Sequence, residues 1–245
     1  MKFLSIKIFI YAQYLFYLFK FNLMKVSCNI RYKKNKFDID IKKLKKNGYI
    51  LIENYFSKDE CKNLIAIIDE FLINNQDKVW NNFDNTDFRV FGINNIGNQF
   101  VSLFYEDENF QKIGEQYIGC KLRNIFTMSG KIIGSENNIG SGGGWHRDSI
   151  QPVFKSMIYL NDVDKLEYGA FQIINDSNRI KNIAQDHYFL KKLDLLNTRF
   201  EETQITKLIE KYNYKISSIL GKAGTVILFD GSYIHRGSPI SSNSR

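Results

Sequence analysis

The sequence has only two prolines, Pro152 and Pro239, and no long stretch rich in proline, glycine and serine. Such stretches often form linkers between domains, so their absence favours a single folded unit. The chain has 245 residues, of which 44% are hydrophobic and 24% are charged, as is ordinary for a soluble globular protein. We therefore expect one domain with an N-terminal elaboration.

Cysteine is also scarce, and the three residues Cys28, Cys61 and Cys120 form no CxxC pair. An odd number of scattered cysteines argues against a disulfide framework and indicates a reducing compartment with free thiols. We therefore expect a cytoplasmic protein, and we assign no role to these thiols.

Acidic residues are nearly absent from the N-terminal part of the chain. Residues 1–46 contain twelve Lys/Arg and two acids, a net charge of +10, whereas the remainder contains 22 basic and 24 acidic residues, a net charge of −2. Nucleic-acid binding needs a basic groove, so the nearly neutral body argues against a nucleic-acid partner. The basic lead-in RYKKNKFDIDIKKLKKN (31–47) is either a solvated helix face or a contact for a membrane surface or polyanion.

The N-terminal apolar run is too short to span a bilayer. Its uninterrupted part, Ile8 to Phe19, has about 12 residues, whereas a spanning helix needs about 20. Lys7 and Lys20 bracket the run, and no A-x-A cleavage site follows it, which argues against a signal peptide.

Two interpretations of this segment remain open. Residues 1–30 form a hydrophobic and basic anchor that gives peripheral membrane contact through residues 1–25, or Met24 is the true start and residues 1–23 are not translated. In either case residues 31–245 form the folded domain.

In the first half of this domain, the sequence pattern predicts alternating helices and strands. A capping box, Ser57-x-x-Glu60, begins a helix that runs to about Ile73. Apolar periodicity and a stop at Gly48 predict the other elements. These are helices at Asp38–Asn47 and Glu108–Ile118, and strands at Tyr49–Asn54 and Phe88–Ile93.

After Lys121, short apolar runs alternate with Gly, Asn, Asp and Ser clusters, a pattern typical of a sandwich or barrel. A charged, helix-like segment at Leu190–Tyr212 is most simply an insertion between strands. The expected strands are Leu122–Met128, Lys131–Ile133, Trp145–Asp148, Ser156–Leu160, Ala170–Ile174, Thr225–Phe229 and Tyr233–His235.

Histidine is scarce, and two of its three occurrences suggest a metal site. His146 and Asp148 form H-x-D in GGGWHRDS, and residues i and i+2 of a strand point to the same face. His235 follows on another expected strand, FDGSYIHRG. Two histidines and one carboxylate form the facial triad of non-haem iron(II) oxygenases. We expect the remaining histidine, His187, at the surface.

An arginine, Arg245, stands ten residues after His235. Its planar fork suits the distal carboxylate of a buried dicarboxylate. Unrelated sequences contain H-x-D, a later histidine and a later arginine in this order much less often by chance than they contain H-x-D alone. The absence of a nearby cysteine disfavours structural zinc, whereas a metal hydrolase with the same three ligands stays open and would give Arg245 no role.

These motifs resemble the phytanoyl-CoA dioxygenase family over residues 37–245. IKKLKKNGYILIENYFSKDECKNLIAIIDEF is similar to the family's lead-in, GGGWHRDS to its first metal motif, and GTVILFDGSYIHRGSPISSNSR to its closing motif. The resemblance implies an α+β, mainly β fold: a double-stranded β-helix, or jelly roll, with flanking N-terminal helices.

The resemblance also implies cofactors and roles. His146, Asp148 and His235 would bind Fe(II), Arg245 would bind the 5-carboxylate of 2-oxoglutarate, and Ser149 would place a hydroxyl near that cosubstrate. The partners would be O2 and a small-molecule substrate, with lipid, sugar-type and amino-acid substrates left open. Because relatives that halogenate lack a carboxylate at the position of Asp148, the chemistry expected is hydroxylation or a related oxidation.

Two departures from the family pattern bear on activity. Asn175-Asp176-Ser177-Asn178 replaces the usual P-G-S-H turn, and the sequence stops at Arg245, where relatives continue the strand. We therefore expect a truncated C-terminal strand. The alternative function is that of a catalytically impaired jelly-roll binding protein descended from such an oxygenase.

Overall fold

The computed structural model describes residues 2–26, 41–125, 127–136 and 138–241. Arg245, Cys28 and most of the basic lead-in lie outside these ranges, so the predictions made for them are not addressed by the structure.

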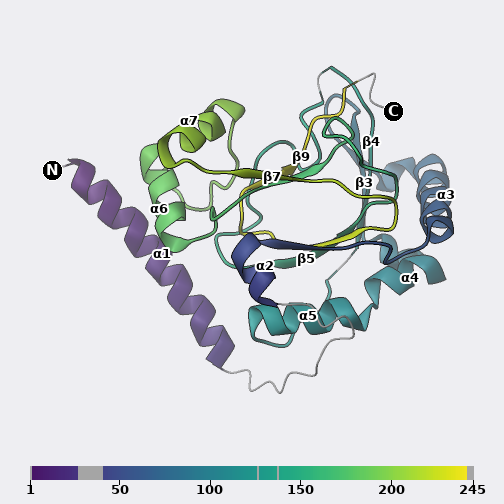
Figure 1. The fold of residues 1–245 in the computed structure, drawn as a ribbon, viewed down its shortest axis with the longest axis horizontal. Coiled ribbons are helices and arrows are strands. Elements are labelled where there is room, and N and C mark those ends of the chain that lie inside the picture. Colours follow the sequence, from purple (N-terminus) through teal and green to yellow (C-terminus); the bar gives the residue numbers. More distant parts are fainter. Residues whose placement is uncertain (1, 27–40, 126, 137, 242–245) are drawn as a thin grey trace.

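Two three-stranded sheets face each other, and each pair of neighbouring strands is antiparallel (Figure 1). The first sheet has the order β1-β8-β5, formed by Tyr49–Ile52, Val226–Asp230 and Phe154–Ile158. The second has the order β7-β6-β9, formed by Ile216–Ile219, Phe171–Ile174 and His235–Gly237. A further antiparallel sheet, β2-β3-β4, consists of Trp80–Asn81, Asp87–Phe91 and Met128–Ile132.

The central strand β8 shows how the sequence builds the two layers. All five of its residues are buried. Ile227 and Phe229 enter the core between the two sheets, whereas Val226 and Leu228 pack on the opposite side among helix residues. Since successive side chains of a strand point to opposite faces, an unbroken apolar run is what a strand covered on both sides requires.

Helices cover the outer faces of the sheets (Figure 1). Phe110 and Ile113 of α5 pack on the outer face of the first sheet, and Ile205 and Leu208 of α7 pack beside β6. The helices are α1 (Lys2–Val26), α2 (Ile41–Asn47), α3 (Lys58–Asn74), α4 (Gln99–Tyr105), α5 (Glu108–Ile118), α6 (Ile180–Phe189) and α7 (Glu202–Tyr212), with 3-10 turns at Gln76–Lys78 and Ile93–Ile96.

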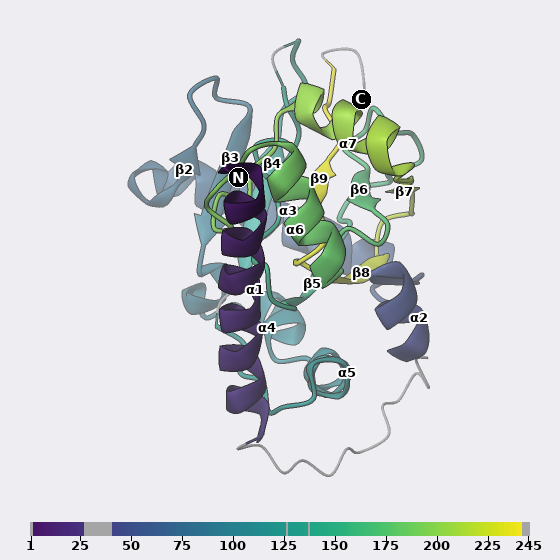
Figure 2. The ribbon, with the colours of Figure 1, turned by 90° about the vertical axis from the view of Figure 1, so that its left-hand side faces the viewer.

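Helix α1 runs along one side of the molecule next to α6 (Figure 2). Ile10 and Tyr14 are buried there against Ile150 and Ile183. Within the described residues, no helix is both long enough and apolar enough to cross a membrane.

Local signals in the sequence located α2, α3, α5 and α7, but they did not indicate α4 or α6. The capping box is confirmed, because Ser57 Oγ accepts from the Glu60 amide at 3.2 Å and the Ser57 amide donates to Glu60 Oε2 at 2.7 Å. The predicted helix Glu108–Ile118 is also confirmed.

Seven of the nine described strands overlap a predicted strand, but not every predicted strand is present. The described part of Leu122–Met128 is not a strand apart from Met128, and Trp145–Asp148 contains only a bridging residue, His146. Strand β7 was not predicted, because its sequence ISSI alternates too briefly to stand out. The expected insertion is helical from Glu202 onward.

The prediction that His187 lies at the surface was wrong. His187 is fully buried on α6 beside Asp186, and neither ring nitrogen has a hydrogen-bond partner among the described residues. Asp186 accepts a hydrogen bond from Arg147 at 2.8 Å, and both of these side chains are also inaccessible to solvent. Burial and the Arg147 cation lower the pKa of His187 to about 4. The histidine is therefore neutral in the folded protein at neutral pH.

This neutral histidine should make the protein less stable in mild acid. The unfolded chain binds a proton on His187 below a pKa of about 6.5, but the folded chain does so only below about 4, so stability is lost as the pH falls through this interval. Between pH 7.5 and pH 5, the free energy of unfolding should fall by about 2 kcal/mol less in His187→Phe than in the wild type. Urea unfolding of both proteins, metal-free, measures the difference. Identical pH dependence in the two would contradict the prediction.

Candidate metal centre

Main-chain hydrogen bonds bring the two halves of the predicted triad together. His146 and His235 exchange amide-to-carbonyl hydrogen bonds of 3.0 and 2.8 Å. The Asp148 amide donates to the Gly231 carbonyl at 2.8 Å, on the turn between β8 and β9. The segment that contains H-x-D therefore pairs with the end of the domain despite not being a regular strand.

The three predicted ligand side chains converge. One ligand atom from each of His146, Asp148 and His235 lies within 4.8 Å of the others. Asp148 oxygens are 3.7 Å from Nε2 of His146 and 3.4 Å from Nε2 of His235. Among the described residues, no other group of His, Cys, Asp and Glu offers such a cluster.

The hydrogen bonds of both imidazoles leave the same nitrogen free for a metal. Nδ1 of His146 lies 2.9 Å from the Gly144 carbonyl, and Nδ1 of His235 lies 2.8 Å from the Tyr233 carbonyl. Because a carbonyl can only accept, each Nδ1 carries the proton, and each Nε2 presents its lone pair toward Asp148. Backbone partners of this kind orient histidine ligands in metal sites.

The electrostatics of the cluster also suit metal binding. Burial and the neighbouring His146 lower the pKa of His235 to about 4, and burial lowers the pKa of His146. Both imidazoles are therefore neutral near pH 7, as metal ligation requires. Lys155 pairs with Asp148 at 2.9 Å. Two neutral imidazoles and one carboxylate without thiolate fit Fe(II).

Two glycines leave room for the ligands. A Cβ on Gly142 would lie 2.4 Å from Cε1 of His146, and a Cβ on Gly231 would lie 2.3 Å from Oδ2 of Asp148. Both distances are far below ordinary contact. The imidazole and the carboxylate can occupy these positions only because neither glycine has a side chain.

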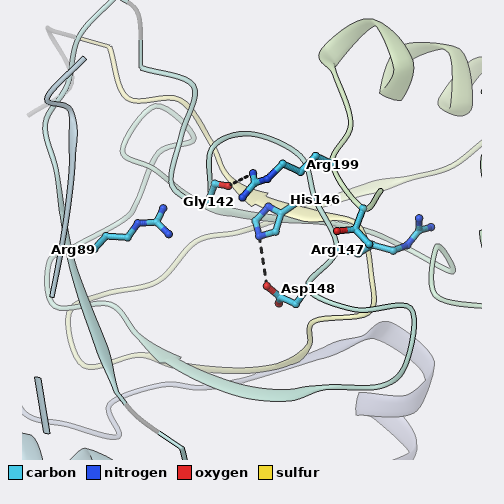
Figure 3. Close-up of a pocket in the computed structure, with 7 residues that line it drawn as sticks. Arg89, Gly142, His146, Arg147, Asp148 and Arg199 are labelled. Carbon is cyan, nitrogen blue, oxygen red and sulfur yellow. Dashed lines mark hydrogen bonds and ion pairs between the residues drawn. The ribbon is translucent and has the colours of Figure 1, made fainter. Parts of the chain in front are cut away.

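A cavity of about 280 Å³ opens beside the ligands (Figure 3). Arg199 lies next to His146, and Arg89 extends toward the cluster from β3, whereas the side chain of Arg147 points away from the cluster. The lining residues are Arg89, Gly142, His146, Arg147, Asp148, Thr198 and Arg199.

Sequence reasoning missed the two arginines of this cavity. Arg199 is placed by pairing with His146, and its Nη1 donates to the Gly142 carbonyl at 2.8 Å. Arg89 lies on β3, where Nε donates to Asp87 at 2.9 Å. Neither arginine is near a ligand in the sequence, so no local motif could identify them.

Ser149 and two side chains next to the predicted ligands in the sequence have structural contacts. Ser149 Oγ accepts from the Gln151 amide at 3.0 Å, and Ser149 is not among the residues that line the cavity. Trp145 is a core residue whose Nε1 donates to Glu202 at 3.0 Å. Arg236 also pairs with Glu202, at 2.7 Å, rather than with the cavity. Arg245 lies outside the described residues.

The fold and the ligand cluster define a candidate non-haem iron oxygenase, and comparison with known proteins identifies the family. The sequence matches phytanoyl-CoA dioxygenase (PhyH) over residues 44–245. The chain belongs to the phytanoyl-CoA dioxygenase family and, as a member of it, is a 2-oxoglutarate-dependent dioxygenase. The resemblance seen in the sequence is therefore confirmed. A search of curated proteins found no match.

Solved structures confirm the fold. The non-haem α-ketoglutarate-dependent carbocyclase SnoK from nogalamycin biosynthesis superposes with a TM-score of 0.59 at 14% identity, covering 88% of this chain and 83% of SnoK. EctD from S. alaskensis with bound Fe superposes with a TM-score of 0.57 at 18% identity, covering 83% of this chain and 71% of EctD. HygX from Streptomyces hygroscopicus with nickel and 2-oxoglutarate superposes with a TM-score of 0.56 at 12% identity, covering 82% of this chain and 80% of HygX. The expected jelly roll with flanking helices is thus confirmed.

The close approach of Gly142 to His146 predicts an effect on metal affinity. Gly142→Ala should displace the imidazole and weaken Mn(II) binding at least tenfold in calorimetric titration. Gly97→Ala is the matched control, because Gly97 also has a positive φ (72°, against 91° at Gly142), but a Cβ added there would meet no heavy atom within 4 Å. Equal affinities in the two variants would show that the imidazole position does not limit metal binding.

Proposed function

We propose that this chain hydroxylates a small-molecule substrate, with iron(II) held by His146, Asp148 and His235. The observation that carries the proposal is the convergence of two Nε2 lone pairs and one carboxylate, within 4.8 Å, beside a cavity. Three ligands on one side of a metal leave its other positions for a cosubstrate and O2.

The residues of the chain would position the reaction rather than carry it out. Bound iron(II) and 2-oxoglutarate would supply the oxidising chemistry with O2. Gly144 and Tyr233 carbonyls hold the two imidazoles in the tautomer that binds metal, and Lys155 holds the Asp148 carboxylate. The retained carboxylate at Asp148 supports hydroxylation rather than halogenation.

The 2-oxoglutarate anchor is proposed as Arg245, on the order of motifs in the sequence. An arginine fork forms a paired, charge-assisted contact with a carboxylate. Arg199, next to His146, and Arg89, which extends toward the cluster, are cations of the described cavity lining. They are the alternative anchors, and Ser149 is proposed as a nearby hydroxyl.

The cavity also bears on the substrate. Its volume of about 280 Å³ lies near the lower end for small-molecule sites, and the guanidinium groups of Arg89 and Arg199 line it. We infer that the part of the substrate nearest the metal is small and polar, and that it carries an acidic group. Some lipids, some sugar-type molecules and amino acids all carry a small, polar, acidic group of this kind.

The metal assignment is tested by removing one ligand. His146→Ala should abolish Fe(II) binding and, with it, 2-oxoglutarate binding measured by anaerobic calorimetry, because the cosubstrate needs the metal. His187→Phe, which removes a histidine outside the cluster, should retain both. The wild-type protein should convert 2-oxoglutarate to succinate. Metal binding without any 2-oxoglutarate binding would instead support the impaired binding protein.

The cosubstrate anchor is tested by three matched substitutions. Arg245→Gln should raise the Kd for 2-oxoglutarate at least tenfold and leave metal affinity unchanged, as expected from the loss of a charge-assisted pair of about 1.5–3 kcal/mol. Arg89→Gln and Arg199→Gln should change that Kd less than threefold. A large effect in either of these, with none in Arg245→Gln, would move the anchor into the described cavity.

A further inference from the structure

Helix α1 carries a second apolar face that no part of the described chain covers. Large apolar side chains recur along it at helical spacing, and each is more than half exposed. Figure 2 shows α1 at the front of the molecule, with no other element over it. We call these residues the outer stripe: Ile8, Phe9, Leu15, Phe16, Phe19 and Leu23.

The opposite face of α1 is fixed to the domain, so the outer stripe cannot turn inward. Ile10 is completely buried and Tyr14 is 6% exposed. Hydrogen bonds add to this packing: Gln13 Nε2 donates to the Leu193 carbonyl at 3.1 Å, and Gln151 Nε2 donates to the Tyr17 carbonyl at 2.6 Å. Rotation of the helix would break these contacts.

Charge indicates what covers the stripe. Residues 1–46 carry a net charge of +10, and Lys7 and Lys20 are exposed on α1 itself. An apolar helical face that carries exposed lysines, in a strongly basic stretch of sequence, matches the anionic surface of a lipid bilayer. A second copy of the chain would instead bring two strongly positive segments together, and such contact is repulsive.

We propose that α1 lies in the plane of an anionic membrane surface, with the outer stripe at the boundary between headgroups and acyl chains. The inner face stays packed on α6, so the domain rests on the membrane without crossing it. A long apolar patch on one side of a folded domain, on a helix that also exposes Lys7 and Lys20, suits peripheral binding. This inference is independent of the metal centre.

Sedimentation with vesicles tests the proposal on the full chain. The protein should bind vesicles of phosphatidylcholine with about 30% phosphatidylserine at least tenfold more tightly than vesicles of phosphatidylcholine alone, and about 0.5 M NaCl should weaken this binding. Phe16→Ser with Phe19→Ser should reduce binding at least tenfold. The matched control, Phe83→Ser with Leu103→Ser, removes exposed apolar side chains elsewhere and should bind as wild type.

Folding and oligomeric state are measured in parallel. Both double variants should retain wild-type circular dichroism and Mn(II) affinity, which shows that the domain is intact. Absence of vesicle binding by the wild type, or equal binding by the Phe16/Phe19 variant, overturns the proposal. So does a wild-type dimer in light scattering that becomes monomeric in that variant without vesicle binding, since a second copy would then cover the stripe.

Discussion

The reciprocal main-chain pairing of His146 and His235 is the constraint on which the rest of the candidate site depends. These residues are far apart in the chain, yet their amides and carbonyls bond to each other at 3.0 and 2.8 Å. The pairing fixes both Cα positions before any side chain is considered. The Nδ1 hydrogen bonds then set the ring orientations, and the Asp148–Gly231 bond brings the carboxylate to the same point. A metal would therefore meet ligands that are already oriented by backbone groups.

Arg147, the residue between His146 and Asp148, anchors this segment on the side away from the cavity. Arg147 is fully buried and bonds to Asp186 and to the Ser177 carbonyl, at 2.8 and 2.7 Å. A buried ion pair contributes little net stability, but removal of one partner leaves an uncompensated charge, which typically costs about 3–5 kcal/mol. The pair therefore acts mainly on geometry: it commits Arg147 to α6, and alternation along the backbone then directs His146 and Asp148 to the cavity (Figure 3).

The sequence predicted the features that depend on neighbouring residues. The capping box at Ser57, the buried strand β8 and the H-x-D spacing all follow from local chemistry, and the structure confirms the first two as predicted. The ligand residues also converge, although their segment is a bridge rather than a strand. Arg199 and His187 could not be placed in this way. Arg199 is positioned by pairing with His146, 53 residues earlier in the chain, and His187 is buried by the packing of α6. Both depend on tertiary contacts that leave no periodic pattern in the sequence.

Helix α1 links the surface of the molecule to this same segment. The family match begins at residue 44, so α1 is outside the part of the chain that the family shares. Yet Ile10 and Tyr14 pack against Ile150, two residues beyond Asp148. Packing in a protein core is dense, so a shift of α1 would be felt by the backbone that carries the carboxylate. If α1 rests on a lipid surface, as we propose, the orientation of that surface is thereby fixed relative to the ligand segment. The added helix would then do more than attach the domain, because it would set which side of the metal centre faces the membrane.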